Sequence, residues 1–263
     1  MNSAPDITGI ALFWGGLLLL IPLLTSLIFK LGLVRELVVA TGRMGIQLWL
    51  AGLFLTYIFN WDSIPLNFCW VLVMIGVAMG TVLKRSALDF RQFAGATFAA
   101  LAISILGVVL FFNILILHLP GGFEARYFII LSGMLLGNSL RGNIIGMTHF
   151  YHSIHRDIHH LQYYLGTGAT LTEALQPYLQ ESLRRALQPT LATMATVGIV
   201  ALPGMMSGQI LGGSSPLLAI KYQIAIMVAI FAAMNLSLLL TLLLTTKTAF
   251  DHRGNLKPGM INE

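Results

Sequence analysis

Long apolar stretches dominate the chain, and short polar segments separate them. A helix needs about 20 apolar residues to cross the roughly 30 Å hydrocarbon core of a bilayer. No stretch alternates apolar and polar residues in the way that the many strands of a transmembrane barrel require. The pattern therefore predicts about seven membrane-spanning helices, at residues 9–29, 44–60, 64–83, 93–117, 127–150, 189–206 and 219–246.

Composition narrows the class of protein further. Of 263 residues, 57% are apolar and only 25 are charged, 15 Lys or Arg and 10 Asp or Glu. Soluble domains carry roughly 25% charged residues, so a soluble globular enzyme is excluded, and the hydrophobicity excludes disorder. The single cysteine, Cys69, excludes a disulfide scaffold. The expected fold is an all-α polytopic membrane protein, one transmembrane domain over residues 1–263 with a helical cytoplasmic insertion at about 151–188.

Basic residues predict the orientation of the chain. Twelve fall in segments that the predicted spans place on one side, namely Lys30, Arg35, Arg43, Lys84, Arg85, Arg91, Arg156, Arg184, Arg185, Lys247, Arg253 and Lys257. Because Lys and Arg accumulate in cytoplasmic loops, that side is expected to be cytoplasmic, with the N-terminus outside and the C-terminus inside. The net charge of +5 then reflects topology and does not indicate a nucleic-acid partner. The first span has no basic segment before it, so we expect an uncleaved helix rather than a signal peptide.

The cytoplasmic insertion reads as short helices. A helix over 151–165 is expected to end at Gly166–Gly168, since glycine adopts a left-handed conformation cheaply. Thr170 and Glu173 have the spacing of a capping box, and Pro177 is expected to interrupt or restart the helix soon after. By pattern alone, this segment either docks into a partner protein or lies on the lipid surface as an amphipathic helix.

Two polar residues lie inside the fifth predicted span. Asn138 and Arg141 are three residues apart and share a helix face. Ionisable groups at this depth are costly and indicate function, which suggests a place in a transport path. The alternative is a packing role, with the Arg141 side chain extending to the interface. Two GxxxG pairs nearby, Gly133/Gly137 and Gly142/Gly146, favour close helix packing.

The sixth predicted span leads into an uncharged run, residues 203–216, that contains Pro203, Gly204, Gly208 and Gln209. Its glycines and prolines exclude one long helix. Irregular backbone at membrane depth must be buried in protein or line a cavity, which makes this run a candidate gate. The alternative is a short outer loop resting at the interface.

Five of the seven histidines fall between residues 149 and 160. The spacing of His152, His155 and His159 places them near one helix face, where they are weak candidates for a metal site. A solvated cytoplasmic helix explains the same pattern. No nucleotide-binding P-loop and no hydrolase or protease motif occurs, so we expect neither catalysis nor a cofactor in this chain.

Several stretches resemble one family together. They are Gly133–Asn138, Gly168–Ala169–Thr170 with Glu173, Pro189–Leu191, the run Leu202–Leu211, Pro216 and Tyr222–Ile224. These residues resemble the FetB family of permease subunits of ABC transporters, which includes bacterial members linked to iron export and plant relatives linked to aluminium tolerance.

The resemblance implies a membrane-spanning permease in the bacterial plasma membrane that has no nucleotide-binding site of its own. It implies a separate ABC-type ATPase as partner and two permease copies around the pore. It favours docking of the insertion onto the ATPase through Gly168, Ala169, Thr170, Glu173 and Pro177. The competing hypotheses are a secondary transporter or channel that acts alone, and a membrane scaffold that transports nothing.

Overall fold

The protein is helical throughout the part that the structure describes, as the apolar pattern predicts. The computed structural model describes residues 8–61, 63–251 and 257. The helices are α1 (Gly9–Leu17), α2 (Leu20–Ile28), α3 (Val34–Trp61), α4 (Ile64–Arg85), α5 (Phe90–Phe111), α6 (Ala125–Arg156), α7 (Ile158–Gly166), α8 (Leu171–Thr196), α9 (Gly204–Leu211) and α10 (Pro216–Ala249), with a π-helical turn, η1 (Phe112–Ile116), after α5. The first residues and Arg253, which enter the orientation argument, lie outside the described residues.

Six of these helices, or helix pairs, are long and apolar enough to cross a membrane: α1 with α2, α3, α4, α5 with η1, α6 and α10. The expected span at 189–206 is wrong as a single helix. Helix α8 ends at Thr196, and a turn containing Gly198 at φ +90° separates it from α9. A positive φ is costly for residues with a side chain, so the glycine sets where the helix stops.

Helix α8 also corrects the expected boundaries of the insertion. It runs without interruption from Leu171 to Thr196, so Pro177 neither breaks nor restarts it, and Pro189 lies inside it as well. A proline inside a helix removes one backbone hydrogen bond. Burial of Ala174, Leu175, Ser182 and Ala186 along the same helix stabilises it against that loss.

The chain breaks inside residues 151–165, where the sequence pattern predicts a single helix. Helix α6 continues to Arg156 and ends at Asp157, so residues 151–165 belong to two helices and not to one. The later break is confirmed, because α7 ends at Gly166 and Gly168 has φ +96°.

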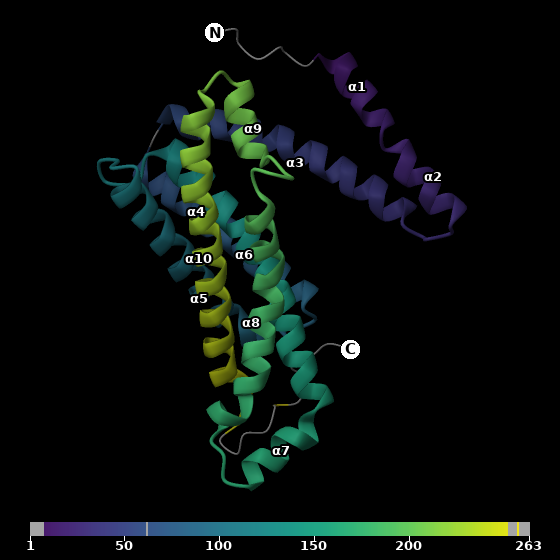
Figure 1. The fold of residues 1–263 in the computed structure, drawn as a ribbon, viewed down its shortest axis with the longest axis vertical. Helices are drawn as coiled ribbons and strands as arrows, with labels where there is room; N and C mark the ends of the chain where they lie inside the picture. The colour runs from purple at the N-terminus through teal and green to yellow at the C-terminus, as the bar shows by residue number, and fades with distance from the viewer. Residues whose placement is uncertain (1–7, 62, 252–256, 258–263) are drawn as a thin grey trace.

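Helix α10 runs along the front of the bundle in Figure 1 and packs against α5, α6, α8 and α9. Two apolar cores fill the bundle. One joins α4, α5, α6 and α10 around Ile105, Phe128 and Ala233. The other joins the opposite ends of these helices to α7 and α8 around Phe93, Tyr151 and Leu242.

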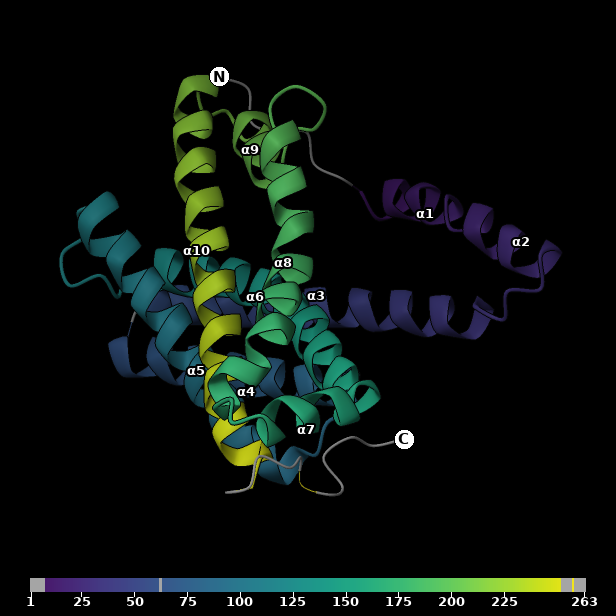
Figure 2. The ribbon, with the colours of Figure 1, turned by 60° about the horizontal axis from the view of Figure 1, so that its bottom comes forward.

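Helices α1 to α3 project away from this bundle (Figure 2). No residue in the most apolar window of α3 is buried within the chain. Apolar surface of this extent in a membrane protein must be covered by lipid or by another protein. The bundle of α4, α5, α6, α8 and α10 therefore contains the packed part of the structure.

The contact between α6 and α10 depends on glycine. A Cβ atom added at Gly142 would lie 2.6 Å from Cγ of Met234, and one added at Gly146 would lie 2.5 Å from Cδ1 of Leu238. Between them, Asn143 donates a buried hydrogen bond of 2.9 Å to Ser237 Oγ. The Gly142/Gly146 pair thus mediates the close packing that its spacing predicts, whereas Gly137 has no atom within 4 Å of its Cβ position.

Candidate functional site

A capped helix start forms the elbow between α7 and α8, which we define as residues 166–177. The Thr170 backbone N–H donates to Glu173 Oε2 at 2.8 Å, and the Glu173 N–H donates to Thr170 Oγ1 at 3.3 Å. The predicted capping box is therefore confirmed. The Thr170 hydroxyl and backbone N–H both donate hydrogen bonds to the Glu173 carboxylate, and these bonds hold the pKa of Glu173 below its ordinary value.

The elbow is turned outward. Gly168, Thr170, Glu173 and Pro177 are exposed, and Ala169 is half-buried. On the other side, Ala174 and Leu175 are buried in the core that α7 and α8 share with α6 and α10. A fixed inner face and a free outer face give the elbow a rigid shape with its capping groups accessible to a partner.

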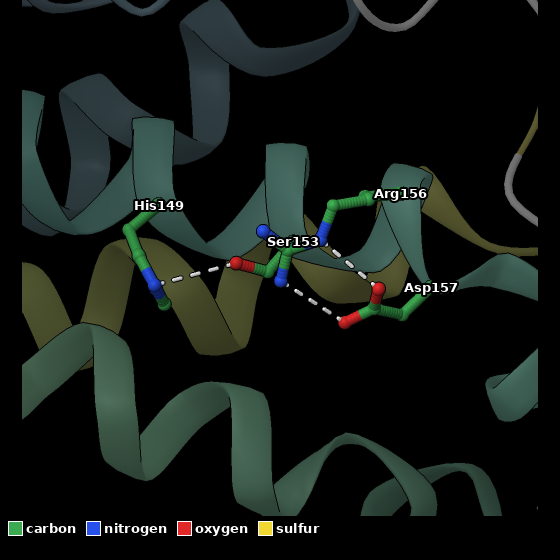
Figure 3. Close-up of polar contacts among 4 residues, drawn as sticks. All are labelled: His149, Ser153, Arg156 and Asp157. Atoms are coloured by element: carbon green, nitrogen blue, oxygen red, sulfur yellow. Dashed lines mark hydrogen bonds and ion pairs between the residues drawn. The ribbon is translucent and has the colours of Figure 1, made fainter.

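The histidine region precedes the elbow. His149 Nδ1 lies 3.0 Å from Ser182 Oγ on α8, and Ser153 Oγ lies 3.3 Å from His149 Nε2 (Figure 3). Arg156 Nε donates to Asp157 Oδ1 at 3.0 Å, and this bond lowers the pKa of the Asp157 carboxyl. His149 is thus used structurally, to join α6 to α8.

The three histidines proposed from sequence lie on two helices. His152 and His155 belong to α6 and His159 belongs to α7, because the chain breaks at Asp157 between them. All three are exposed. Among the described residues, no group of three or more His, Cys, Asp and Glu side chains is arranged to hold a metal ion. The shared helix face that the spacing predicts is absent from this arrangement.

Asn138 and Arg141 line a cavity of about 150 Å³ between α6, α8 and α10. Thr190 and Thr193 contribute from α8, and Met227, Ile230 and Met234 from α10. Asn138 donates its amide hydrogen to the Met134 carbonyl at 2.9 Å, which leaves its side-chain oxygen free to accept a hydrogen bond. Thr190 Oγ1 lies 3.6 Å from Met234 Sδ. The cavity brings the two polar residues predicted from sequence to one site.

The segment proposed as a gate contains α9, which begins after Pro203 and ends before Gly213 at φ +95°. Nothing lies within 4 Å of the Cβ positions of Gly204 and Gly208, so within one chain these glycines do not mediate close packing. The preceding turn exposes Ile199 and Val200, by 90% and 79%. This apolar, irregular segment has the composition expected at a membrane interface.

Gln209 lines a second cavity, of about 320 Å³. Arg126, Tyr127, Tyr222 and Ser214 supply its other polar groups. Within the described residues, the buried Oε1 of Gln209 has no hydrogen-bond partner. Sequence pattern does not mark Arg126 or Tyr127 as functional, because both lie at a span end where such residues are common.

The two cavities follow one another along α6 and α10, and we call the pair the groove. On α6 its lining residues recur every three or four positions, at Arg126, Ile130, Met134, Asn138 and Arg141. On α10 they recur every four, at Leu218, Tyr222, Ile226, Ile230 and Met234. Neighbouring members of each set lie on the same side of their helix, and each row winds slowly around the helix axis. The two cavities therefore lie in succession along the α6–α10 pair, one lined by Arg126 and the other by Arg141.

The helical bundle, its apolar surface and an internal polar groove define a polytopic helical membrane protein. The chain belongs to the family described as "Uncharacterised protein family (UPF0014)", whose family model matches residues 10–250. No solved structure matches the chain.

Relatives cover most of the chain. The UPF0014 membrane protein YjkA of Bacillus subtilis (strain 168) is 32% identical over 241 residues, which are 90% of this chain and 94% of the relative. The probable iron export permease protein FetB of Escherichia coli (strain K12) is 32% identical over 256 residues, 97% of each chain. The protein ALUMINUM SENSITIVE 3 of Arabidopsis thaliana is 32% identical over 201 residues, 75% of this chain and 71% of the relative.

Proposed function

We propose that this chain is the permease subunit of an ATP-binding-cassette transporter that exports a metal ion, such as iron, or a complex of it. A separate ATPase subunit supplies the energy. The description of the relative FetB as a probable iron export permease supports the transport class. The observation that carries the proposal for this chain is the elbow, whose capping box is formed and whose outer face is exposed.

The charge distribution supports a cytoplasmic elbow. The core that contains α7 and the start of α8 also contains Leu83 near the end of α4, Ile154 near the end of α6 and Ala249 at the end of α10. Those helix ends carry Lys84, Arg85, Arg156 and Lys247. Basic residues gather on the cytoplasmic side, where an ATPase subunit binds ATP. In this proposal α8 crosses the membrane beside the six apolar spans, which places the N-terminus outside and the C-terminus inside.

A second copy of the chain completes the transporter in this proposal. One chain presents one elbow, and a pair of ATPase subunits needs two. The outward projection of α1 to α3, with little buried surface of their own, supports further contacts in the membrane. The bacterial plasma membrane is the expected location, in line with the bacterial relatives.

Co-expression with candidate ABC-type ATPase subunits, followed by co-purification, tests the proposal. We expect the two proteins to form a complex, and the reconstituted complex to hydrolyse ATP faster when the transported metal is present. A transporter that acts alone predicts no complex and transport without ATP. The described acidic residues lie at helix ends or in the polar half of α8, so ion-coupled transport through a carboxylate inside a span has no support here.

A further inference from the structure

The cavity of about 150 Å³ is here called the inner cavity, and Arg141 is the only charged residue among the described ones that line it. It lies 16 residues after the start of α6, about 24 Å at 1.5 Å per residue, and its side chain is exposed on the surface of the single chain. In the described part of the chain, the Arg141 guanidinium has no ion-pair or hydrogen-bond partner. An unpaired charge within a membrane-spanning helix calls for a group that supplies the opposite charge.

The second cavity, of about 320 Å³ and here called the outer cavity, is also lined by a single arginine among the described residues. Among the described residues, Arg126 is the only charged one in its lining, which otherwise offers the hydroxyls of Tyr127 and Tyr222 and the amide of Gln209. No described Asp, Glu, His or Cys lines either cavity. The described acidic residues all lie elsewhere, at Glu36, Asp89, Glu124, Asp157, Glu173, Glu181 and Asp251.

These linings do not suit a bare metal cation. Divalent iron, manganese or zinc bind carboxylate, imidazole or thiolate groups, and the groove offers none of them. A cationic lining selects anions, as in pores built from Arg or Lys. The guanidinium group pairs with a carboxylate or phosphate through two parallel hydrogen bonds. Hydroxyl and amide groups beside it can bind the remaining oxygens of such a ligand.

We infer that the groove binds an oxyanion, a carboxylate or phosphate compound either free or as the chelator of a metal, with Arg141 as its central contact. The inference rests on the proposed function and specifies its substrate class: metal that crosses through this chain travels as an anionic complex. Thr190, Thr193 and Asn138 surround Arg141 and orient the ligand. Arg126 marks the outer end of the same groove.

Binding to the purified chain, without its ATPase, tests this inference. The probes are citrate, inorganic phosphate, ferric citrate and ferrous ion alone, each titrated by calorimetry in lipid nanodiscs. We expect at least one oxyanion probe to bind and ferrous ion alone not to bind. Binding of ferric citrate but not of citrate identifies the metal chelate as the ligand, and equal binding of both identifies the free oxyanion. Binding of ferrous ion alone, or of no oxyanion, overturns the inference.

Variants separate Arg141 from general surface charge. Arg141→Gln should weaken oxyanion binding at least tenfold. The affinity of Arg141→Lys should lie between those of the wild type and Arg141→Gln, because lysine keeps the charge but lacks the planar guanidinium group. The matched control is Arg184→Gln, at an exposed arginine of α8 outside the groove, which should change binding less than twofold. If Arg141→Gln does not fold, Arg141→Lys decides: wild-type affinity in either folded variant overturns the inference.

The ATPase is absent from these titrations, so the two proposals fail separately. Loss of ATPase association with intact oxyanion binding rejects the transporter assignment alone. Intact association without oxyanion binding rejects the substrate class alone.

Discussion

A Cβ atom at Gly146 of α6 would lie 2.5 Å from Cδ1 of Leu238 and 3.1 Å from its Cγ. Leu238 is fully buried on α10, so its side chain has little room to move aside. The glycine thus sets how closely α6 and α10 approach.

Gly146→Leu should therefore destabilise the chain by about 1–3 kcal/mol, the usual cost of overpacking a core. The measurement is the melting temperature of the purified protein in detergent. The matched control is Gly137→Leu on the same helix, where nothing lies within 4 Å of the Cβ position and little change is expected. Equal melting temperatures for both variants would contradict the role given to Gly146.

Removing the capping box should weaken the complex with the ATPase. The double variant Thr170→Ala with Glu173→Ala loses both reciprocal hydrogen bonds at the start of α8. A cap contributes about 0.5–2 kcal/mol to helix stability, and here the affected turn faces outward. Membrane insertion should stay intact while co-purification of the ATPase falls. Wild-type recovery of the ATPase with the double variant would count against docking at the elbow.

The same capping box makes the elbow sensitive to acid. Because the pKa of Glu173 is lowered in the folded chain, its stabilising contribution is present above the ordinary glutamate pKa and is lost as pH falls through the lowered pKa. Hydrogen-exchange protection of the Glu173 amide, corrected for the intrinsic exchange rate, should fall over that range. Glu173→Gln has no carboxylate to titrate, so its protection should stay constant there. A wild-type profile as flat as that of the variant would refute the prediction.

Gly208→Leu tests the gate. Within one chain the added side chain meets no neighbour, so the variant should fold and reach the membrane. If two copies approach each other at α9, the leucine should block that approach and abolish transport. Gly208→Ala adds less volume and should reduce transport less. Export at the wild-type rate by Gly208→Leu would assign the segment to a surface loop.

Replacing His152, His155 and His159 together with Gln should change transport and metal-stimulated ATPase activity by less than about threefold, under roughly 0.7 kcal/mol. The three side chains are exposed and lie on two helices. His149→Gln serves as a contrast, because His149 bonds Ser182 and its loss should lower stability. A tenfold loss of metal affinity in the triple variant, with the complex assembled, would instead make these histidines an entry site.

Local signals in the sequence were sufficient for several features. The number of apolar residues in a row predicts a polytopic helical membrane protein, since backbone groups in lipid must be satisfied within a helix or a closed barrel. The spacing of Thr170 and Glu173 predicts the capping box, whose bonds lie within one turn. The glycine at 168 predicts the end of α7 because positive φ is a local property.

Tertiary packing decided the features that local signals predicted wrongly or missed. Pro177 does not break α8, because buried residues along the helix hold it against α6 and α10. Of the two GxxxG pairs with the same spacing, only Gly142/Gly146 lies directly against side chains of α10 at both positions. Asp157, a single residue, separates His159 from the face shared by His152 and His155.

For the groove, too, part of the lining follows from the sequence and part only from the packing of the helices. The sequence by itself determined that Asn138 and Arg141 share a helix face, because helical periodicity fixes the direction of each side chain. It could not determine that Thr190 of α8 and Met234 of α10 lie opposite them, or that Arg126 continues the same groove. Residues from distant parts of the chain meet only when the helices pack, and the side chains at every helix contact together determine that packing.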